Sequence, residues 1–178
     1  IETATWTGQT SGYGGINNLD NCTNRPGSYC DVTEGSVPEH AIDNNDYIDA
    51  VLIKFDSSVI LNQVTLGWRQ YDWDFSIFAY TGTGDPVGTP ATATQAANLK
   101  LNSTLGGGWT LVQTHAATGG CSSSCGDDLT VSGLNSGDVS SSWWVISAYA
   151  NAYAGTASKL GEGNDYFKLL NVAGTQES

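Results

Sequence analysis

Two groups of oxygen-bearing side chains in this sequence are spaced as ligands of a hard cation would be. The first group is a pair, Asp72 and Asp74, which lie two residues apart. In a β-strand, residues at that spacing point to the same face. Two like charges held there repel each other unless water or a cation separates them. The pair is therefore predicted to bind a cation or to cap a turn where a strand begins.

The second group lies in residues 43–49, just before the first clear core strand. Asp and Asn side chains crowd this turn, and Ca²⁺ binds six to eight such oxygens in flexible geometry. The turn lacks the spacing and the distal Glu of an EF-hand, and a plain turn capped by Asx side chains is the alternative. The acidic loop 126–128 is a weaker candidate of the same type. The calcium ligands we expect are Asp43, Asn45, Asp46, Asp72 and Asp74.

The common catalytic motifs are missing from the chain. The two histidines, His40 and His115, are far apart in sequence, and no GxSxG elbow, HExxH helix or Walker loop is present. A pair of glycosidase-type carboxylates stays open, because acidic residues are plentiful. All five glutamates, however, fall in turn-rich segments or near the termini. We therefore expect that the protein is not an enzyme.

Aromatic residues on the strands suggest a second kind of site. Carbohydrate-binding modules with sandwich folds commonly stack sugars on such rings, so Tyr71 and Trp73 are the candidate sugar-binding residues. The alternative is that these rings pack in the core or at a subunit interface. Trp143 and Trp144 are adjacent and would face opposite sides of a strand, so at least one of them is expected in the core.

Composition and charge narrow the function classes. The chain has 178 residues, enough for one domain, with 39% hydrophobic and only 13% charged residues and 22 glycines. That composition is typical of short strands joined by many turns. The net charge of −12 makes nucleic acid a poor partner, because phosphates would be repelled. Divalent cations, polysaccharides and other proteins remain as partners.

The four cysteines form two local pairs, Cys22 with Cys30 and Cys121 with Cys125. These spacings and the scarcity of histidine argue against zinc, so two disulfides are predicted, each stabilising by roughly 2–3 kcal/mol. Disulfides indicate an oxidising compartment. The chain has no Met and no apolar run of membrane-spanning length. We expect a mature secreted product from which a signal peptide has been removed.

Hydrophobic periodicity predicts about eight strands and no long helix. Turn signals separate the strands, which favours an all-β fold, an antiparallel β-sandwich of jelly-roll type. Residues 1–37 are expected to form an extended N-terminal segment with a disulfide loop, and residues 38–178 the sandwich body. Residues 129–142 are expected to form a short strand and a turn, residues 99–105 are open between helix and strand, and residues 118–128 are expected as a loop. The other expected strands lie in residues 1–7, 47–56, 57–70, 74–82, 107–115, 141–150 and 164–174.

Several blocks of the sequence resemble the bacterial exosortase-dependent surface proteins. These are secreted proteins of Gram-negative bacteria that usually carry a Pro-Glu-Pro C-terminal sorting segment. The resemblance runs from about Pro38 to Gly174, and this chain ends at GTQES without such a segment. It implies export to the cell surface or the extracellular matrix, often with exopolysaccharide in biofilms, and it implies no catalytic residues. The blocks are VPEHAIDNNDYIDAVLIKFDSSVILNQVTLGW, DFSIFAYTG, GGWTLV, SSWWVISAY and NDYFKLLNVAG.

We therefore expect a structural protein of the cell surface or matrix that can assemble with itself into filaments. The chain is rich in strand-forming segments but poor in the lysines that commonly protect sheet edges. Its first strand is separated from the body by about 30 turn-rich residues and could pair with a neighbouring copy. The residues expected in that contact are Ile1, Thr3, Thr5 and Trp6. An extracellular carbohydrate-binding module is the alternative function.

Overall fold

The computed structural model is built from β-strands. It describes residues 41–44, 49–86, 108–149 and 164–176, together with two short strands, β1 (Gln9–Thr10) and β2 (Ile16–Asn17). No helix occurs among these residues, so none there is long and apolar enough to cross a membrane. The other described strands are β3 (Ile42–Asp43), β4 (Ala50–Tyr71), β5 (Phe75–Tyr80), β6 (Trp109–His115), β7 (Cys121–Cys125), β8 (Leu129–Ser132), β9 (Ser141–Ala148) and β10 (Asp165–Gln176).

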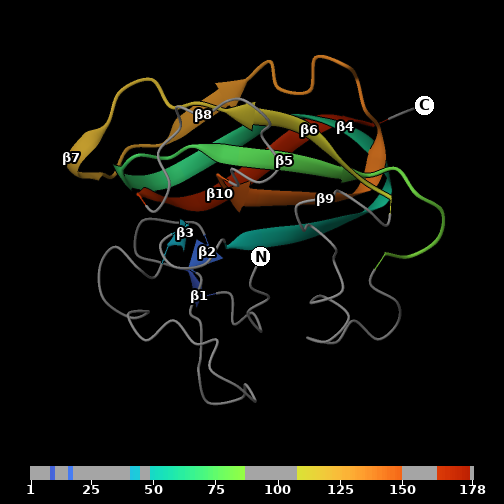
Figure 1. The fold of residues 1–178 in the computed structure, drawn as a ribbon, viewed down its shortest axis with the longest axis horizontal. Coiled ribbons are helices and arrows are strands. Elements are labelled where there is room, and N and C mark those ends of the chain that lie inside the picture. Colours follow the sequence, from blue (N-terminus) through green and yellow to red (C-terminus); the bar gives the residue numbers. More distant parts are fainter. Residues whose placement is uncertain are drawn as a thin grey trace.

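Eight of these strands form one antiparallel sheet, in the order β3-β10-β4-β9-β5-β6, with β7 and β8 also paired to β4 (Figure 1). The sheet is open, because β6 and β3 at its two ends do not pair with each other. The predicted all-β antiparallel class is confirmed. Hydrogen bonding joins all eight strands into a single sheet, so the sandwich of jelly-roll type stays a prediction.

The strand β4 is 22 residues long and pairs with different strands along its length. Its first part, from Ala50 to Lys54, pairs with β9, and its second part, from Val59 onward, pairs with β10 and with β8 and β7. The register breaks between Lys54 and Val59, where the polar residues 56–58 are exposed. The two strands predicted at 47–56 and 57–70 are thus one continuous strand. Exposed polar residues carry the chain across this irregularity, and no Gly or Pro interrupts it.

The main core takes alternate residues from β5 and β9 and residues from both parts of β4. Trp144 and Ile146 lie in it, whereas Trp143 and Val145 belong to a second, smaller cluster. Adjacent residues thus face opposite sides of β9, as the sequence predicts. The fully buried side chains of the main core include Leu61, Val64, Leu66, Phe75, Ile77, Trp144, Ile146 and Phe167. The smaller cluster contains Phe78, Trp109 and Val145, with Tyr80 and Trp143 packed against it.

Two predicted features differ from the structure. The second cysteine segment was expected as a loop, but Cys121–Cys125 is the strand β7, because it pairs with Arg69, Gln70 and Tyr71 at the end of β4. The strand expected at 57–70 also extends one residue further, since β4 continues to Tyr71. The predictions for residues 1–7, for 99–105 and for the Cys22–Cys30 disulfide lie outside the described residues.

The close approach of β10 to β4 generates a test of the packing. A Cβ atom added at Gly174 would collide with the backbone carbonyl of Ile60. We predict that Gly174→Ala lowers the free energy of unfolding by about 1–3 kcal/mol, because a backbone neighbour cannot move aside cheaply. Gly137→Ala is the matched control, since nothing lies within 4 Å of its added Cβ. Equal stability of the two variants in urea denaturation would contradict this packing.

Candidate metal centre

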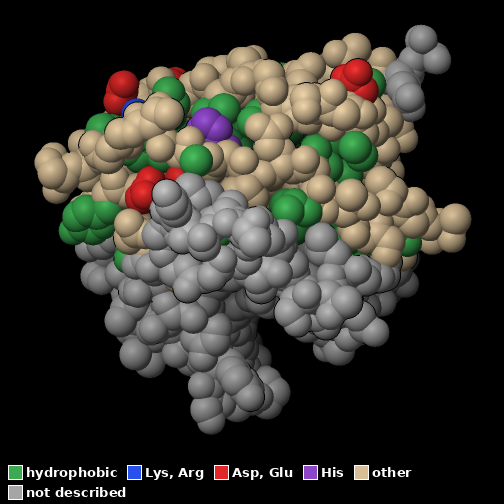
Figure 2. All heavy atoms as spheres, turned by 45° about the horizontal axis from the view of Figure 1, so that its top comes forward, with side chains coloured by type: hydrophobic (Ala, Val, Ile, Leu, Met, Phe, Trp, Pro, Cys, Tyr) green, Lys and Arg blue, Asp and Glu red, His purple; other side chains and the backbone are tan. Residues whose placement is uncertain are grey.

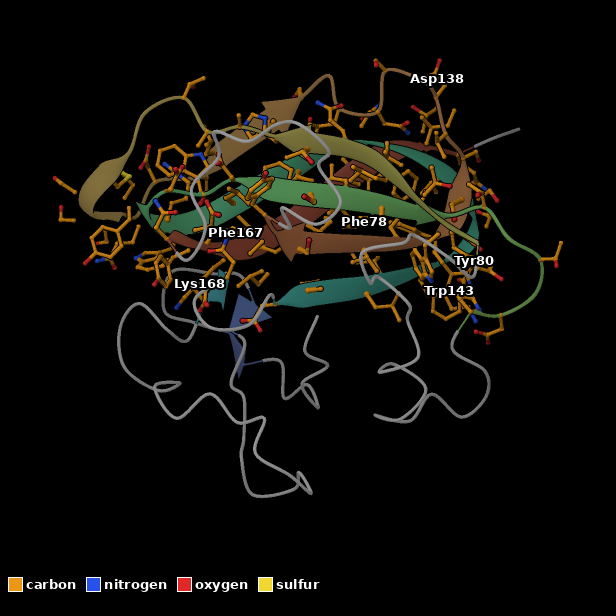
Figure 3. The ribbon with its side chains drawn as sticks, in the orientation of Figure 1. Phe78, Tyr80, Asp138, Trp143, Phe167 and Lys168 are labelled. Carbon is orange, nitrogen blue, oxygen red and sulfur yellow. A yellow bond between two sulfur atoms is a disulfide. The ribbon has the colours of Figure 1, made fainter. Side chains whose placement is uncertain are left out.

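Three carboxylates meet where β4 ends and where β5 and β10 begin. They belong to Asp72, Asp74 and Asp165, and one oxygen of each lies within 4.8 Å of the others. Figure 3 shows Phe167 and Lys168, the β10 residues that follow Asp165, at the opposite end of the sheet from Tyr80 and Trp143. The carboxylate cluster therefore lies at one end of the sheet, away from the smaller apolar cluster.

Strand pairing brings Asp165 to the aspartate pair. Asp165 is the register partner of Tyr71 across β4 and β10, and it forms an isolated bridge with Asp72. The backbone N–H of Asp74 donates to Oδ1 of Asp165 over 2.8 Å. The backbone N–H of Tyr166 donates to the carbonyl of Asp72 over 3.0 Å. The cluster is thus part of the β4–β10 ladder.

Asn44 connects this cluster to the second predicted group of ligands. Its Nδ2 donates to Oδ2 of Asp165 over 2.5 Å, and its Oδ1 accepts the backbone N–H of Asp165 over 3.0 Å. The same Nδ2 lies 3.2 Å from the carbonyl of Tyr149. Asp43 and Asp49, which are close to Asn44 in the sequence, are also buried. The backbone N–H of Asp49 donates to the carbonyl of Asp43. Asn45 and Asp46, also predicted as ligands, lie outside the described residues.

The carboxylates differ in how deeply they are buried. Asp165 is 0% exposed and Asp74 is 2% exposed, whereas Asp72 is half-buried. Oδ1 of Asp74 accepts the backbone N–H of Ala117 over 2.5 Å, and Oδ1 of Asp72 accepts that of Trp73 over 2.9 Å. Access to the cluster is therefore from the side of Asp72. The two inner carboxylates are enclosed by the protein, an arrangement that suits holding an ion or a proton.

Burial also disfavours the charged forms of the inner carboxylates. The pKa of Asp165 is raised from its ordinary 3.8 to about 8. Burial is the largest cause, and the negative charges of Asp74 and Asp72 act in the same direction. The N–H donors of Asp74 and Asn44 oppose this rise. Burial likewise raises the pKa of Asp74, with Asp72 adding to it. Three carboxylates can lie this close together only if they share a proton or bind a cation, because their negative charges repel one another.

The donor set fits a calcium ion. Ca²⁺ takes oxygen ligands at about 2.3–2.6 Å, so ligands on opposite sides of the ion lie about 5 Å apart. The mutual separation of the three carboxylate oxygens falls within that span. Each oxygen that already accepts a backbone N–H keeps a second lone pair for an ion. The residues that would hold the ion are Asp72, Asp74 and Asp165.

Sequence reasoning found the aspartate pair but missed Asp165. The pair was visible because both residues lie in one short segment, whereas Asp165 is more than 90 residues away in the chain. One signal could have revealed it. The tripeptide Asn-Asp-Tyr occurs twice, at 45–47 and at 164–166, each time just before an apolar strand segment. The second copy supplies Asp165, and Asn44, the partner of Asp165, directly precedes the first.

The two predicted sugar-binding residues, Trp73 and Tyr71, differ in exposure. Trp73 is 6% exposed, with the Arg69 guanidinium 5.2 Å from its ring centre, whereas Tyr71 is 47% exposed and contacts Tyr166 edge-on. Tyr71 is the one large hydrophobic residue that is exposed in the described part of the chain. A sugar platform made of both rings at the surface is therefore not formed, although Tyr71 alone could stack on a ligand.

The second cysteine segment and the acidic loop after it brace the end of β4. A disulfide joins Cys121 to Cys125, as predicted. In the acidic loop, Asp127 binds Arg69 through its carbonyl, 2.7 Å from Nη1, and through its carboxylate, 3.2 Å from Nη2. The loop thus provides an ion-pair partner for the buried Arg69. This ion pair explains the position of Asp127 without a bound cation.

Comparison of the chain with protein-family models, with curated proteins and with solved structures finds no match. The resemblance to exosortase-dependent surface proteins therefore stays a prediction.

Protonation of Asp165 generates a prediction for the cation-free protein. Its pKa is higher in the folded than in the unfolded chain, so its contribution to stability is full below about pH 4 and is lost as the pH rises through about 8. We predict that, in chelator, the free energy of unfolding falls between pH 6.5 and 8 by up to about 1.4 kcal/mol per pH unit. The charged groups facing Asp165 are Asp74 and Asp72.

The matched variants are Asp165→Asn, which removes the titrating group, and Asp56→Asn, which removes an exposed carboxylate of β4. His115 acts with the opposite sign, because burial lowers its pKa from 6.5, so measurements above pH 6.5 separate the two groups. Urea denaturation should show a flatter pH dependence for Asp165→Asn alone. An unchanged slope in that variant would show that Asp165 does not hold the proton.

Proposed function

We propose that this chain is a secreted, non-catalytic structural protein of the bacterial cell surface or extracellular matrix, which assembles with copies of itself by strand addition. The observation that carries the proposal is the open sheet. In the described part of the chain, the sheet ends in strands that pair on one side only. Unpaired strand edges are ready sites for another strand, whose main-chain hydrogen bonds supply the affinity.

The side chains of the described residues support the same function. Lysines commonly protect sheet edges, but of the two described lysines Lys168 is buried against Trp68, and Lys54 lies over the ring of Trp143. The Cys121–Cys125 disulfide fits an oxidising compartment outside the cytoplasm. Extracellular polysaccharide would be a neighbour in such a matrix, and carbohydrate binding through Tyr71 remains the alternative function.

A calcium ion at Asp72, Asp74 and Asp165 is part of the proposal. Extracellular calcium would replace the shared proton, neutralise the cluster and fix the ends of β4, β5 and β10 relative to one another. Bound calcium would then stabilise the folded subunit from which an assembly is built.

We predict that calcium raises the melting temperature and that chelation lowers it at fixed ionic strength. A ligand at a hundred times its Kd stabilises by about 2.7 kcal/mol. For a domain of this size, 1 kcal/mol shifts the melting temperature by about 2–4 °C. We expect a rise of about 5–10 °C in the wild type and in Asp56→Asn, and little or none in Asp72→Asn. Scanning calorimetry at pH 7.5 measures this, and an equal rise in all three proteins would place the calcium elsewhere.

We also predict that deletion of residues 1–7 yields a soluble monomer with an intact body. The deleted segment is expected to provide the added strand, and it lies outside the described sheet. Light scattering after size-exclusion chromatography gives the mass, and the melting temperature shows whether the body is intact. Assembly of the truncated protein at the wild-type concentration would rule out this segment as the donor.

A further inference from the structure

The strand β6 is the end of the sheet that is best suited to accept another strand. It pairs with β5 through six register positions, from Trp109 to His115. On its other side no described strand pairs with it. In a β-strand, alternate N–H and C=O groups point to each side, so one row of donors and acceptors along β6 lacks a strand partner.

The sequence of β6 lacks the features that protect natural sheet edges. WTLVQTH contains no Lys, Arg, Asp, Glu, Pro or Gly. Its pairing with β5 has a single irregularity, opposite the step from Ile77 to Phe78. Burial lowers the pKa of His115, so this residue is neutral at pH 7. An uncharged edge of seven residues is long enough to hold another strand of ordinary length.

The edges at β8, β10 and β3 are poorer acceptors. The strand β8 has four residues and follows the acidic residues Asp127 and Asp128. Strand β10 has three register irregularities against β4, between Lys168 and Gly174. The strand β3 has two residues. Irregularities and short length both discourage strand addition. With seven residues and one irregularity, β6 is longer than β8 and β3 and more regular than β10.

Charge also favours β6 as a contact between copies. Each chain carries a net charge of −12, so two copies repel each other unless carboxylates are sparse where they touch. Among the side chains drawn in colour in Figure 2, few are charged. Contact along an uncharged strand would bring no carboxylate of β6 toward the partner.

We propose that the outer edge of β6 accepts residues 1–7 of a second copy of this chain as an added strand. This inference depends on the proposed function and names its acceptor. The segment IETATWT has seven residues, like β6, and one charged side chain, Glu2. Gly8 alone separates this segment from β1, and β2, the strand paired with β1, lies near β10. Each copy would donate at one place and accept at another, which gives an open, head-to-tail chain.

The first test places a lysine on the acceptor strand. Thr110 is an exposed residue of β6, and Thr110→Lys adds a charge that a partner strand would have to desolvate. Thr175→Lys makes the same change on the exposed outer part of β10 and serves as the control. We expect the concentration needed for assembly to rise at least about tenfold for Thr110→Lys, equivalent to about 1.4 kcal/mol, and to stay at the wild-type value for Thr175→Lys.

The second test mixes two proteins at a concentration at which the wild type assembles and neither of the two assembles alone. The chain without residues 1–7 can accept but not donate, whereas Thr110→Lys can donate but not accept. Each alone should be monomeric, and an equimolar mixture should give a one-to-one dimer in light scattering. A mixture that stays monomeric, or a Thr110→Lys protein that assembles like the wild type, would overturn β6 as the acceptor. A wild-type chain that never assembles would instead refute the proposed function itself.

Discussion

The buried carboxylate of Asp165 is the interaction on which one whole end of the structure depends. It accepts the backbone N–H of Asp74 at the start of β5 and the side-chain amide of Asn44 after β3. Its own strand, β10, pairs with both β3 and β4. A charge buried this deeply is costly unless it is neutralised, and Asp72 and Asp74 increase the cost. The fold therefore requires a proton or a cation at this point, which couples its stability to the solution around it.

The rest of the fold follows from alternation along the strands. In β5 and β9 successive residues belong to different apolar clusters, so both faces of the central strands are covered with hydrophobic side chains. The long strand β4 contributes from both of its parts to the main core. These patterns are local, which is why the sequence predicts the strands at 74–82, 107–115 and 141–150 close to their observed bounds. The continuity of β4 was not predictable, because polar residues 56–58 look like a turn when the pairing partners are unknown.

The candidate site could be predicted only in part, for the same reason. Asp72 and Asp74 are two residues apart, which made them a visible pair in the sequence, although they lie between β4 and β5 and not within a strand. Asp165 and Asn44 join them through pairing between distant strands, and spacing in a single segment cannot reveal that. Trp73 shows the converse problem. The sequence made it a candidate for stacking on a sugar, but the Arg69 guanidinium and the main core enclose it.

An open, acidic sheet with an uncharged edge fits a subunit that is stable by itself and adds to others through its backbone. Calcium would stabilise one end of the subunit, and strand addition would occur along β6 at the edge of the sheet. The most direct measurement is electron microscopy of the purified full-length chain at neutral pH with millimolar calcium. The account predicts filaments of uniform width. Single particles of monomer size at every concentration would contradict it.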